Sequence, residues 1–352
     1  RDPSAPTIKL SPMAKAPVID GVLSPGEWDG AAATNVFHEL LKQNVVMPAS
    51  ILKIGYDNQN LYLAAQMPFG KAGKPFATIR DRDGSIYLDD ALEVFVDPRH
   101  DNATSYQFVA NALGSFSDMK DKDMAWNGDW KVATSSGDGV WYIEFCIPFN
   151  TVGIKLSDTE DTIVGFNVCL DRRNPDGSYT WAPLLQEGGF HQPGKFAHLI
   201  LGKKNANLSC LLSQTEKQFS FDITNNGNPA DVTIKIKNSG NILEEKTVSV
   251  SGNQKITLDI PQQNGIAPDG EYIWEVNALD HTDASLLYRH TGSMIIRRAA
   301  SISLRKYFIQ GKIGVDALMP ITTDGVDKYN VTASICDMSG KELLSQTKEN
   351  IL

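Results

Sequence analysis

The stretch that decides the fold reads Tyr87-Leu88-Asp89-Asp90-Ala91-Leu92-Glu93-Val94-Phe95-Val96-Asp97-Pro98. Its centre, residues 91–96, is a short apolar run rich in β-branched and aromatic residues, bounded by acids and a proline. This pattern predicts a strand near the middle of a β-structure. Because a buried unpaired carboxylate is costly, the four acids of the stretch either face solvent or hold a cation or a polar ligand.

Similar short runs recur on both sides of this stretch, separated by turn signals and with almost no helical periodicity. They are residues 51–57, 61–67, 105–112, 141–149, 164–173 and 194–201. Many short strands with such spacing predict an all-β fold and, over residues 16–202, a β-sandwich. The polar, proline-rich residues 1–15 are expected to form an N-terminal linker or a cut end.

A polar break at Gly202-Lys203-Lys204-Asn205 marks the first domain boundary. Beyond it, residues 206–298 hold roughly seven strand-like runs, which predicts an immunoglobulin-like β-sandwich without the paired-cysteine hallmark. Residues 300–352 give a partial immunoglobulin-like β domain with an open sheet edge. We therefore expect the chain to be a fragment of a longer parent protein, or this piece to pair with another.

Composition narrows the function classes. The 352 residues are 41% hydrophobic and 21% charged, which is ordinary for globular domains, and the formal net charge is -9. This acidity argues against nucleic-acid binding, which usually requires a basic face. No apolar run reaches the length of a membrane span, and the N-terminal stretch does not resemble a signal peptide.

Four cysteines, Cys146, Cys169, Cys210 and Cys336, lack the close pairing of a zinc or redox motif. Buried free thiols are favoured over a disulfide for Cys146 and Cys169, and the cellular compartment stays open.

Several segments together resemble the family 9 carbohydrate-binding modules, relatives of the DOMON-like sandwiches, over about residues 10–202. The segments are residues 18–21 with Glu27-Trp28, 61–63, 89–97, 141–149, 165–168 and 191–197. Their order and spacing are more specific for the fold than for sugar binding.

The resemblance implies a non-catalytic module of the kind appended to secreted polysaccharide-degrading enzymes, with structural calcium and a terminal sugar held between two aromatic rings. The two aromatic positions fall on Tyr87 and Phe190, where the family's best-known type has tryptophan. A ring of either kind can stack on a sugar's C–H face. The family's basic sugar-binding residue falls on Val109, which supplies no donor and puts a site of the same kind in doubt.

Further ligand candidates come from the residues themselves. Trp126 and Trp130 lie in an acidic loop, where exposed tryptophans often contact ligands, although packing of the loop on its own sandwich is slightly favoured. His191 and Gln192 flank the aromatic position and are candidate partners for hydroxyl groups. Calcium prefers carboxylate and carbonyl oxygens at loop ends. The candidate ligands for such a site are Asp20, Glu27, Asp90 and Asp97.

Rival functions are a glycoside hydrolase, a haem protein and a structural or adhesive spacer. A hydrolase would use paired carboxylates, of which Glu144 is the acid expected to face inward. Axial haem ligands would come from methionine and histidine. The residues available for that role are Met67, Met119, Met124, His191 and His198. Tandem sandwiches suit the spacer.

The sequence is therefore interpreted as a non-catalytic, carbohydrate-binding, multidomain β-protein that is secreted, cell-surface or periplasmic. Its expected partner is a polysaccharide or oligosaccharide, held by aromatic stacking and hydroxyl hydrogen bonds, with calcium as a structural cofactor. The identity of the sugar and the oligomeric state stay open.

Overall fold

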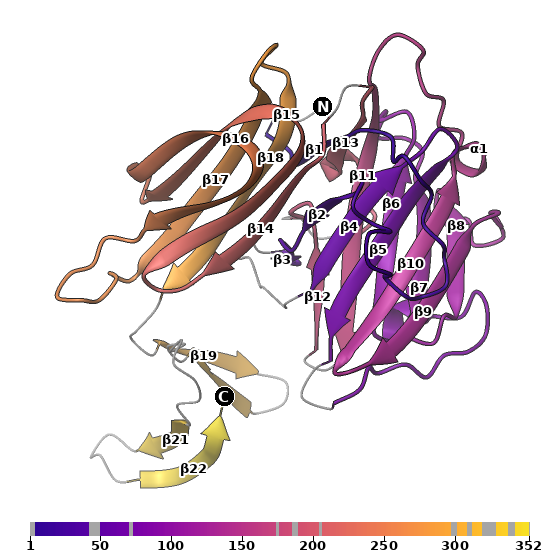
Figure 1. Ribbon diagram of the computed structural model, residues 1–352. Coiled ribbons are helices and arrows are strands. Elements are labelled where there is room, and N and C mark those ends of the chain that lie inside the picture. The colour runs from indigo at the N-terminus through magenta and orange to yellow at the C-terminus, as the bar shows by residue number, and fades with distance from the viewer. Residues whose placement is uncertain are drawn as a thin grey trace.

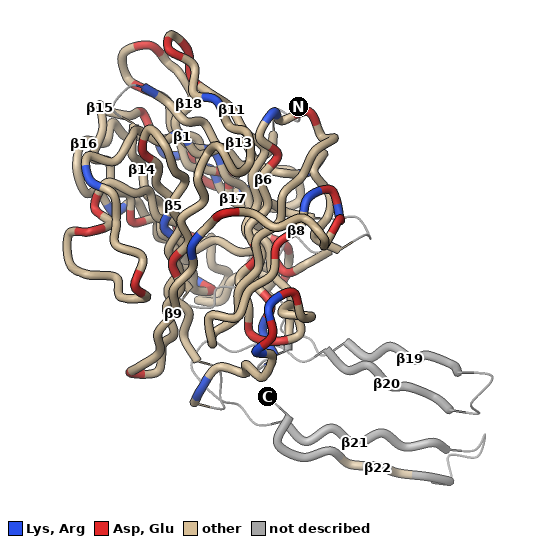
Figure 2. The backbone as a smooth tube through the Cα atoms, turned by 90° about the vertical axis from the view of Figure 1, so that its right-hand side faces the viewer, with Lys and Arg blue, Asp and Glu red and all other residues tan. Residues whose placement is uncertain are grey.

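The computed structural model describes residues 4–41, 50–69, 73–173, 176–184, 189–203, 206–296, 301–307, 312–318, 329–336 and 342–351 (Figure 1). Strands dominate these segments, so the prediction of an all-β fold is confirmed. No helix in the described part of the chain is long and apolar enough to cross a membrane. Lys/Arg and Asp/Glu residues are interspersed along it (Figure 2).

The first unit is a sandwich of two mainly antiparallel sheets. The first sheet consists, in order, of β8 (Phe116–Lys120), β7 (Tyr106–Asn111), β6 (Ala91–Asp97) and β11 (Thr162–Arg173), whose two halves pair with β13 (Ala197–Leu201) and β12 (Asp176–Thr180). The second consists of β9 (Lys131–Gly137), β10 (Val140–Pro148), β5 (Asn60–Pro68), β4 (Ile51–Tyr56) and β2 (Ala32–Thr34). β3 (His38–Glu39) pairs with β12 of the first sheet, and the short helices η1 (Ile86–Leu88), α1 (Phe149–Val152) and η2 (Pro193–Lys195) lie in connections between strands.

Strand β6 is buried on both of its faces. Alternation directs Leu92, Val94 and Val96 into the main core between the two sheets. On the outer face, Ala91 and Phe95 belong to two smaller clusters formed by the loops that cover this sheet. Loops therefore cover the outer face of β6, and the acidic residues of the strand, Glu93 and Asp97, are buried.

The second unit is built from two long strands that each run through two sheets. β14 (Leu208–Gln214) pairs with the first part of β15 (Gln218–Asn238), which pairs with the last part of β16 (Asn241–Asp259). The later part of β15 then pairs with the first part of β16 and with β17 (Gly270–Asp280), which pairs with β18 (Leu286–Ile296). The assignment of an immunoglobulin-like topology stays a prediction.

The sequence-based boundaries in this unit are partly wrong. The expected turns at residues 225–227 and 251–253 lie inside β15 and β16, where the register shifts between Asn225 and Ala230. A bulge of this kind bends a strand without ending it, so four expected strands become two.

The N-terminal strand β1 (Thr7–Leu10) joins the two units. It pairs in parallel with β13, Ile8 opposite Leu199, and antiparallel with β18, Ile8 opposite Tyr288. All four residues of β1 are buried. The prediction that residues 1–15 form a linker is therefore wrong for this strand, which is part of the shared core.

Side-chain hydrogen bonds and a single pairing position between two strands also connect the two units. Asn35 donates to the carbonyl of Leu212 (2.9 Å) and accepts from its N–H (2.8 Å), as a paired strand would. Cys210 in β14 is opposite Thr34 in β2. The hydrophobic core is continuous across both units. Strand pairing also joins their sheets into one hydrogen-bonded assembly.

The last unit contains two hairpins. β19 (Ser301–Tyr307) pairs with β20 (Lys312–Leu318), and β21 (Tyr329–Cys336) pairs with β22 (Glu342–Ile351). The three expected strand regions, residues 301–308, 312–318 and 331–337, overlap β19, β20 and β21, although β21 begins two residues earlier than expected. Phe308 and Asp337 lie outside the described residues.

We expect Ile8→Ala to lower the free energy of unfolding by about 2–5 kcal/mol, because truncation of a fully buried aliphatic side chain between the two units leaves a cavity. Urea unfolding followed by circular dichroism measures this loss. Val18→Ala is the matched control, since Val18 is 58% exposed and its truncation changes stability by about 0.5 kcal/mol or less. Equal losses in the two variants would contradict the placement of β1 in the core.

Candidate ligand-binding face of the first sandwich

Asp89 holds the loop of residues 76–90 against the outer face of the first sheet. Its carboxylate, 1% exposed, accepts hydrogen bonds from the N–H groups of Thr78 (3.0 Å) and Ile79 (2.8 Å). Asn111 in β7 donates both to Asp89 (2.8 Å) and to the carbonyl of Ile79 (2.8 Å). These bonds satisfy the buried carboxylate and fix the loop to the strand beneath it.

Asp90 and Arg173 together position the rim of this face. Asp90 accepts from the N–H groups of Phe76 (2.8 Å) and Arg173 (2.6 Å). The guanidinium of Arg173 in turn donates to the carbonyls of Leu88 (2.8 Å) and Tyr87 (2.5 Å). The Tyr87 side chain is 52% exposed on this anchored turn, so its ring is available to solvent.

A buried polar network lies at the centre of the face. Gln107 in β7 donates to Glu93 in β6 (2.6 Å), and Ser178 in β12 donates to Asp171 in β11 (2.9 Å). Burial, and then the neighbouring Asp171 carboxyl, raise the pKa of Glu93 well above its usual range. Two carboxyl groups that share a buried site cannot both ionise readily, so the Glu93–Asp171 pair retains a proton.

Aromatic residues cover the other end of β6. Phe190 is 9% exposed and packs edge-on against Phe95, with ring centroids 6.3 Å apart, and His191 packs against the same ring at 5.3 Å. Burial lowers the pKa of His191, which favours its neutral form. Gln192 donates to the carbonyl of Gly189 (2.8 Å), within the same turn.

The two aromatic residues expected to flank a ligand are thus presented differently. Tyr87 is exposed beside the Ala91 end of β6, whereas Phe190 is buried on Phe95, about 13 Å further along the strand at its usual rise. Phe190 therefore has a packing partner that the sequence did not indicate. A joint role of the two rings around one ligand stays a prediction.

Val109 lies in an apolar cluster under the covering loop. It is 2% exposed and packs with Ile86 and Ala91, against which Ile79 also lies. The family position that would carry a basic sugar-binding side chain is therefore filled by hydrocarbon here. Any hydrogen bonds to a ligand must come from elsewhere on the rim.

Trp126 and Trp130 have packing roles rather than the exposed, ligand-facing position expected of loop tryptophans. Trp130 is 8% exposed, stacks on Phe145 at 5.4 Å, and donates its indole N–H to Asp118 (2.6 Å). Trp126 packs edge-on against Tyr106 at 5.1 Å. The loop folds back on the sandwich because Asp118 provides a buried acceptor for it.

Glu144 anchors the N-terminal turn of the sandwich. Its carboxylate accepts from the N–H groups of Asp20 (3.0 Å) and Gly21 (2.7 Å) and from the indole of Trp28 (3.0 Å). Gly21 has a φ of 86°, and a side chain there would collide with the backbone of Thr134. Glu144 is thus the inward-facing acid that was expected. Its hydrogen bonds to the turn at residues 20–21 and to Trp28 give it a structural role.

The four acids predicted to bind calcium do not converge. Asp90 and Asp97 lie at opposite ends of β6. Each acid is engaged by backbone N–H groups: Asp20 by Val22 (2.9 Å), Glu27 by Val18 (2.6 Å), Asp90 by Phe76 and Asp97 by Asn102 (2.8 Å). Among the described residues, no group of three or more His, Cys, Asp or Glu side chains is arranged to hold a metal ion. The prediction of one shared site is therefore wrong.

The candidate haem ligands are also dispersed. Met67 in β5 is buried in the core between the sheets, and Met124 is 51% exposed in a loop. His191 packs on Phe95 on the outer face, and His198 contacts His100 at 2.5 Å between ring nitrogens. Met119 in β8 is opposite Gln107, which is opposite Phe95 in β6, so a haem role for Met119 and His191 stays a prediction.

We expect Glu93→Gln to flatten the pH dependence of stability. The raised pKa means that the folded state binds the proton more tightly than the unfolded state does. The stabilising contribution is therefore complete below the unfolded value of about 4.3 and is lost as pH rises toward the folded value. The neutral amide keeps the bond to Gln107, so the variant loses less stability between pH 4 and pH 8, as measured by urea unfolding.

Glu160→Gln is the control, because Glu160 is exposed on a loop. It should retain the pH dependence of the parent chain. The same slope in the parent and in Glu93→Gln would show that Glu93 is not protonated in the folded state.

Comparisons place these observations in a family. A model of the family described as "Carbohydrate family 9 binding domain-like" matches residues 19–204, more than half of the chain. Among solved structures, a proposed carbohydrate-binding protein from Bacteroides uniformis is 17% identical over 56% of this chain and 100% of its own, with a TM-score of 0.47. A family 9 carbohydrate-binding module from Caldicellulosiruptor kristjanssonii in complex with cellotriose is 18% identical over 56% of this chain and 93% of its own, with a TM-score of 0.40. No curated protein matches. On the match of the family model, the chain belongs to the carbohydrate family 9 binding domain-like family.

Proposed function

We propose that the first sandwich is a non-catalytic module that binds a saccharide on the loop-covered outer face of β6, β7 and β11. The observation that carries this proposal is the family match over residues 19–204. A half-exposed aromatic ring, held on a rim that is hydrogen-bonded to the sheet, supports the choice of face. A ring fixed in this way loses little conformational freedom when a ligand binds.

In the proposed mechanism, Tyr87 provides the apolar surface and the polar rim provides orientation. The phenol ring stacks on the C–H face of a sugar residue. The partly exposed side chains of His191 and Gln192 are the proposed hydroxyl partners. Glu93 and Asp171 are almost fully buried, so they support the floor through Gln107 and Ser178 and do not contact the sugar.

Two parts of the proposal rest on the family alone. A location outside the cytoplasm would fit a module that meets polysaccharides. Calcium, if bound, would act at individual loops, because the four acids first considered lie apart. Thermal unfolding with and without a chelator tests the metal, and an unchanged midpoint counts against it.

We expect the unmutated chain to bind to at least one polysaccharide on a glycan array without releasing sugar from it. Tyr87→Ala should weaken that binding about tenfold, which corresponds to about 1.4 kcal/mol, because the stacking surface is lost. Isothermal titration with the best array ligand measures the change. Ile266→Ala is the control, since Ile266 is 48% exposed but belongs to the second sandwich.

A second candidate function is a structural spacer. It is favoured by the continuous core of the two sandwiches, which makes them a stiff unit. An array without any bound glycan would support the spacer and contradict the carbohydrate-binding proposal.

A further inference from the structure

The two sandwiches enclose a pair of histidines where they meet. His38 comes from β3 of the first sandwich, and His290 comes from β18 of the second. Their Nε2 atoms are 3.0 Å apart, and both side chains are 0% exposed. This hydrogen bond links the two units through residues that are 252 positions apart in the sequence.

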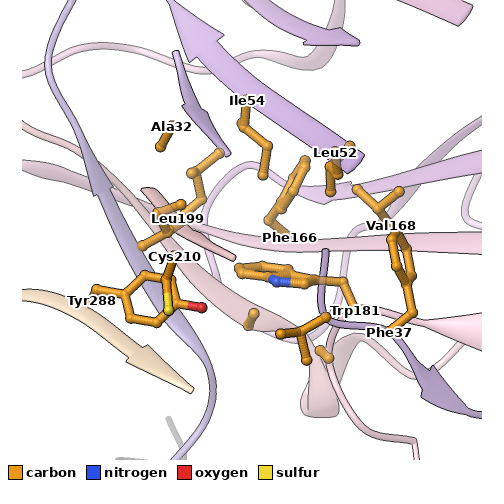
Figure 3. Packing of buried hydrophobic residues seen from close by; sticks show 14 of the residues in the cluster. Ala32, Phe37, Leu52, Ile54, Phe166, Val168, Trp181, Leu199, Cys210 and Tyr288 are labelled. Carbon is orange, nitrogen blue, oxygen red and sulfur yellow. The ribbon is translucent and has the colours of Figure 1, made fainter. Parts of the chain in front are cut away.

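Aromatic and apolar groups surround the pair. Trp181 of the first sandwich and Trp274 of the second both pack edge-on against His290, at 5.7 and 5.9 Å. Figure 3 shows Tyr288 and Cys210 of the second sandwich in one cluster with Trp181 and other residues of the first. The surroundings are therefore poor at solvating a charge.

Among the residues that the structure describes, the titratable groups that face His290 offer it no compensating negative charge. Tyr288 of β18 lies 3.4 Å from Nδ1 of His290, and Cys210 of β14 lies beside Tyr288. Burial raises the pKa of both groups, that of Cys210 to about 12, so both are neutral. Glu39 of β3 and Arg289 of β18 follow and precede the two histidines, and alternation directs them to the opposite strand faces. Arg289 is bonded there to Asn277 of β17 (2.8 Å).

The bond between the two rings requires a bare Nε2 on the accepting ring, so at least one of the two imidazoles is neutral. Burial first, and then His38, lower the pKa of His290 well below its usual range. A histidine whose folded pKa is lowered contributes stability that is present above the unfolded value of about 6.5. That contribution is lost as pH falls below this value, by up to tenfold in the equilibrium constant per pH unit for each proton taken up.

We propose that the His38–His290 pair is an acid-sensitive latch: uptake of a proton from mildly acidic solution releases the second sandwich from the first. Release lets the imidazole of His290 reach water and carry its charge there. Each sandwich retains its own paired strands, whereas the β1–β18 and β2–β14 contacts that cross the junction separate. The latch is independent of the carbohydrate-binding proposal, because neither histidine lies on the outer face of β6.

Small-angle X-ray scattering and far-ultraviolet circular dichroism of the full chain, from pH 8 to pH 4.5, test the latch. We expect the radius of gyration to rise below about pH 6 while the β-sheet signal is retained. In the double variant His38→Gln/His290→Gln, the amides keep a donor and an acceptor but cannot take up the proton, so this rise should disappear. His281→Gln is the control and should behave as the parent does, since the side chain of His281 is 60% exposed.

Three results would overturn the proposal. These are a constant radius of gyration in the parent, an equal rise in the double variant, and loss of the β-sheet signal in the same step as the rise. Histidine proton resonances of the parent chain provide a readout that does not depend on folding of the variant. If His38 and His290 both titrate near pH 6.5 in the docked protein, the pair is not a latch.

Discussion

A carboxylate in the interior of a β-sandwich must find hydrogen-bond donors or keep a proton, and β6 brings several carboxylates inside at once. Each is satisfied differently. Asp89 is satisfied by a covering loop and Asn111, and Asp90 by the backbone of Phe76 and Arg173. Glu93 keeps a proton beside Asp171. These bonds close the outer face, so the exposed Tyr87 depends on the buried acids that follow it in the chain.

A second dependence runs between the units. The first sandwich shares its core with the second, because β18 lies beside β1 and Tyr288 packs with residues of both units. Docking through strand pairing and a shared core gives a stiffer junction than a linker would. The buried His290 belongs to this junction, and its lowered pKa is the basis of the proposed coupling between the junction and pH.

The alternation and spacing of the strands predicted the all-β fold and the first sandwich, because a period of two is visible in any half-buried strand. The cover on the outer face of β6 could not be predicted, since alternation reports which residues share a face and not what lies over it. Phe190 and Val109 illustrate this limit: their partners, Phe95 and Ile86, are distant in sequence.

Short strands and long-range ion pairs also limit what can be predicted from the sequence. β1 has four residues and includes Lys9, so it resembles a linker. Lys9 is nevertheless buried, because its ammonium pairs with Asp161 at 2.8 Å. Likewise, nothing local shows that Trp130 will find Asp118 and Phe145. The carboxylate pair of the candidate site was missed because Asp171 lies in a different strand-like run from Glu93.

The position of β1 has a consequence for the order of folding. Residues 7–10 leave the ribosome before their partners, residues 198–201 and 288–289. At about 5–20 residues per second, the strand waits on the order of tens of seconds before its second partner exists. Because loop closure over such separations is slow, we expect β1 to pair after β13 and β18 have formed. β1 is thus made before both of the strands that it joins, and its place between them stays empty until they exist.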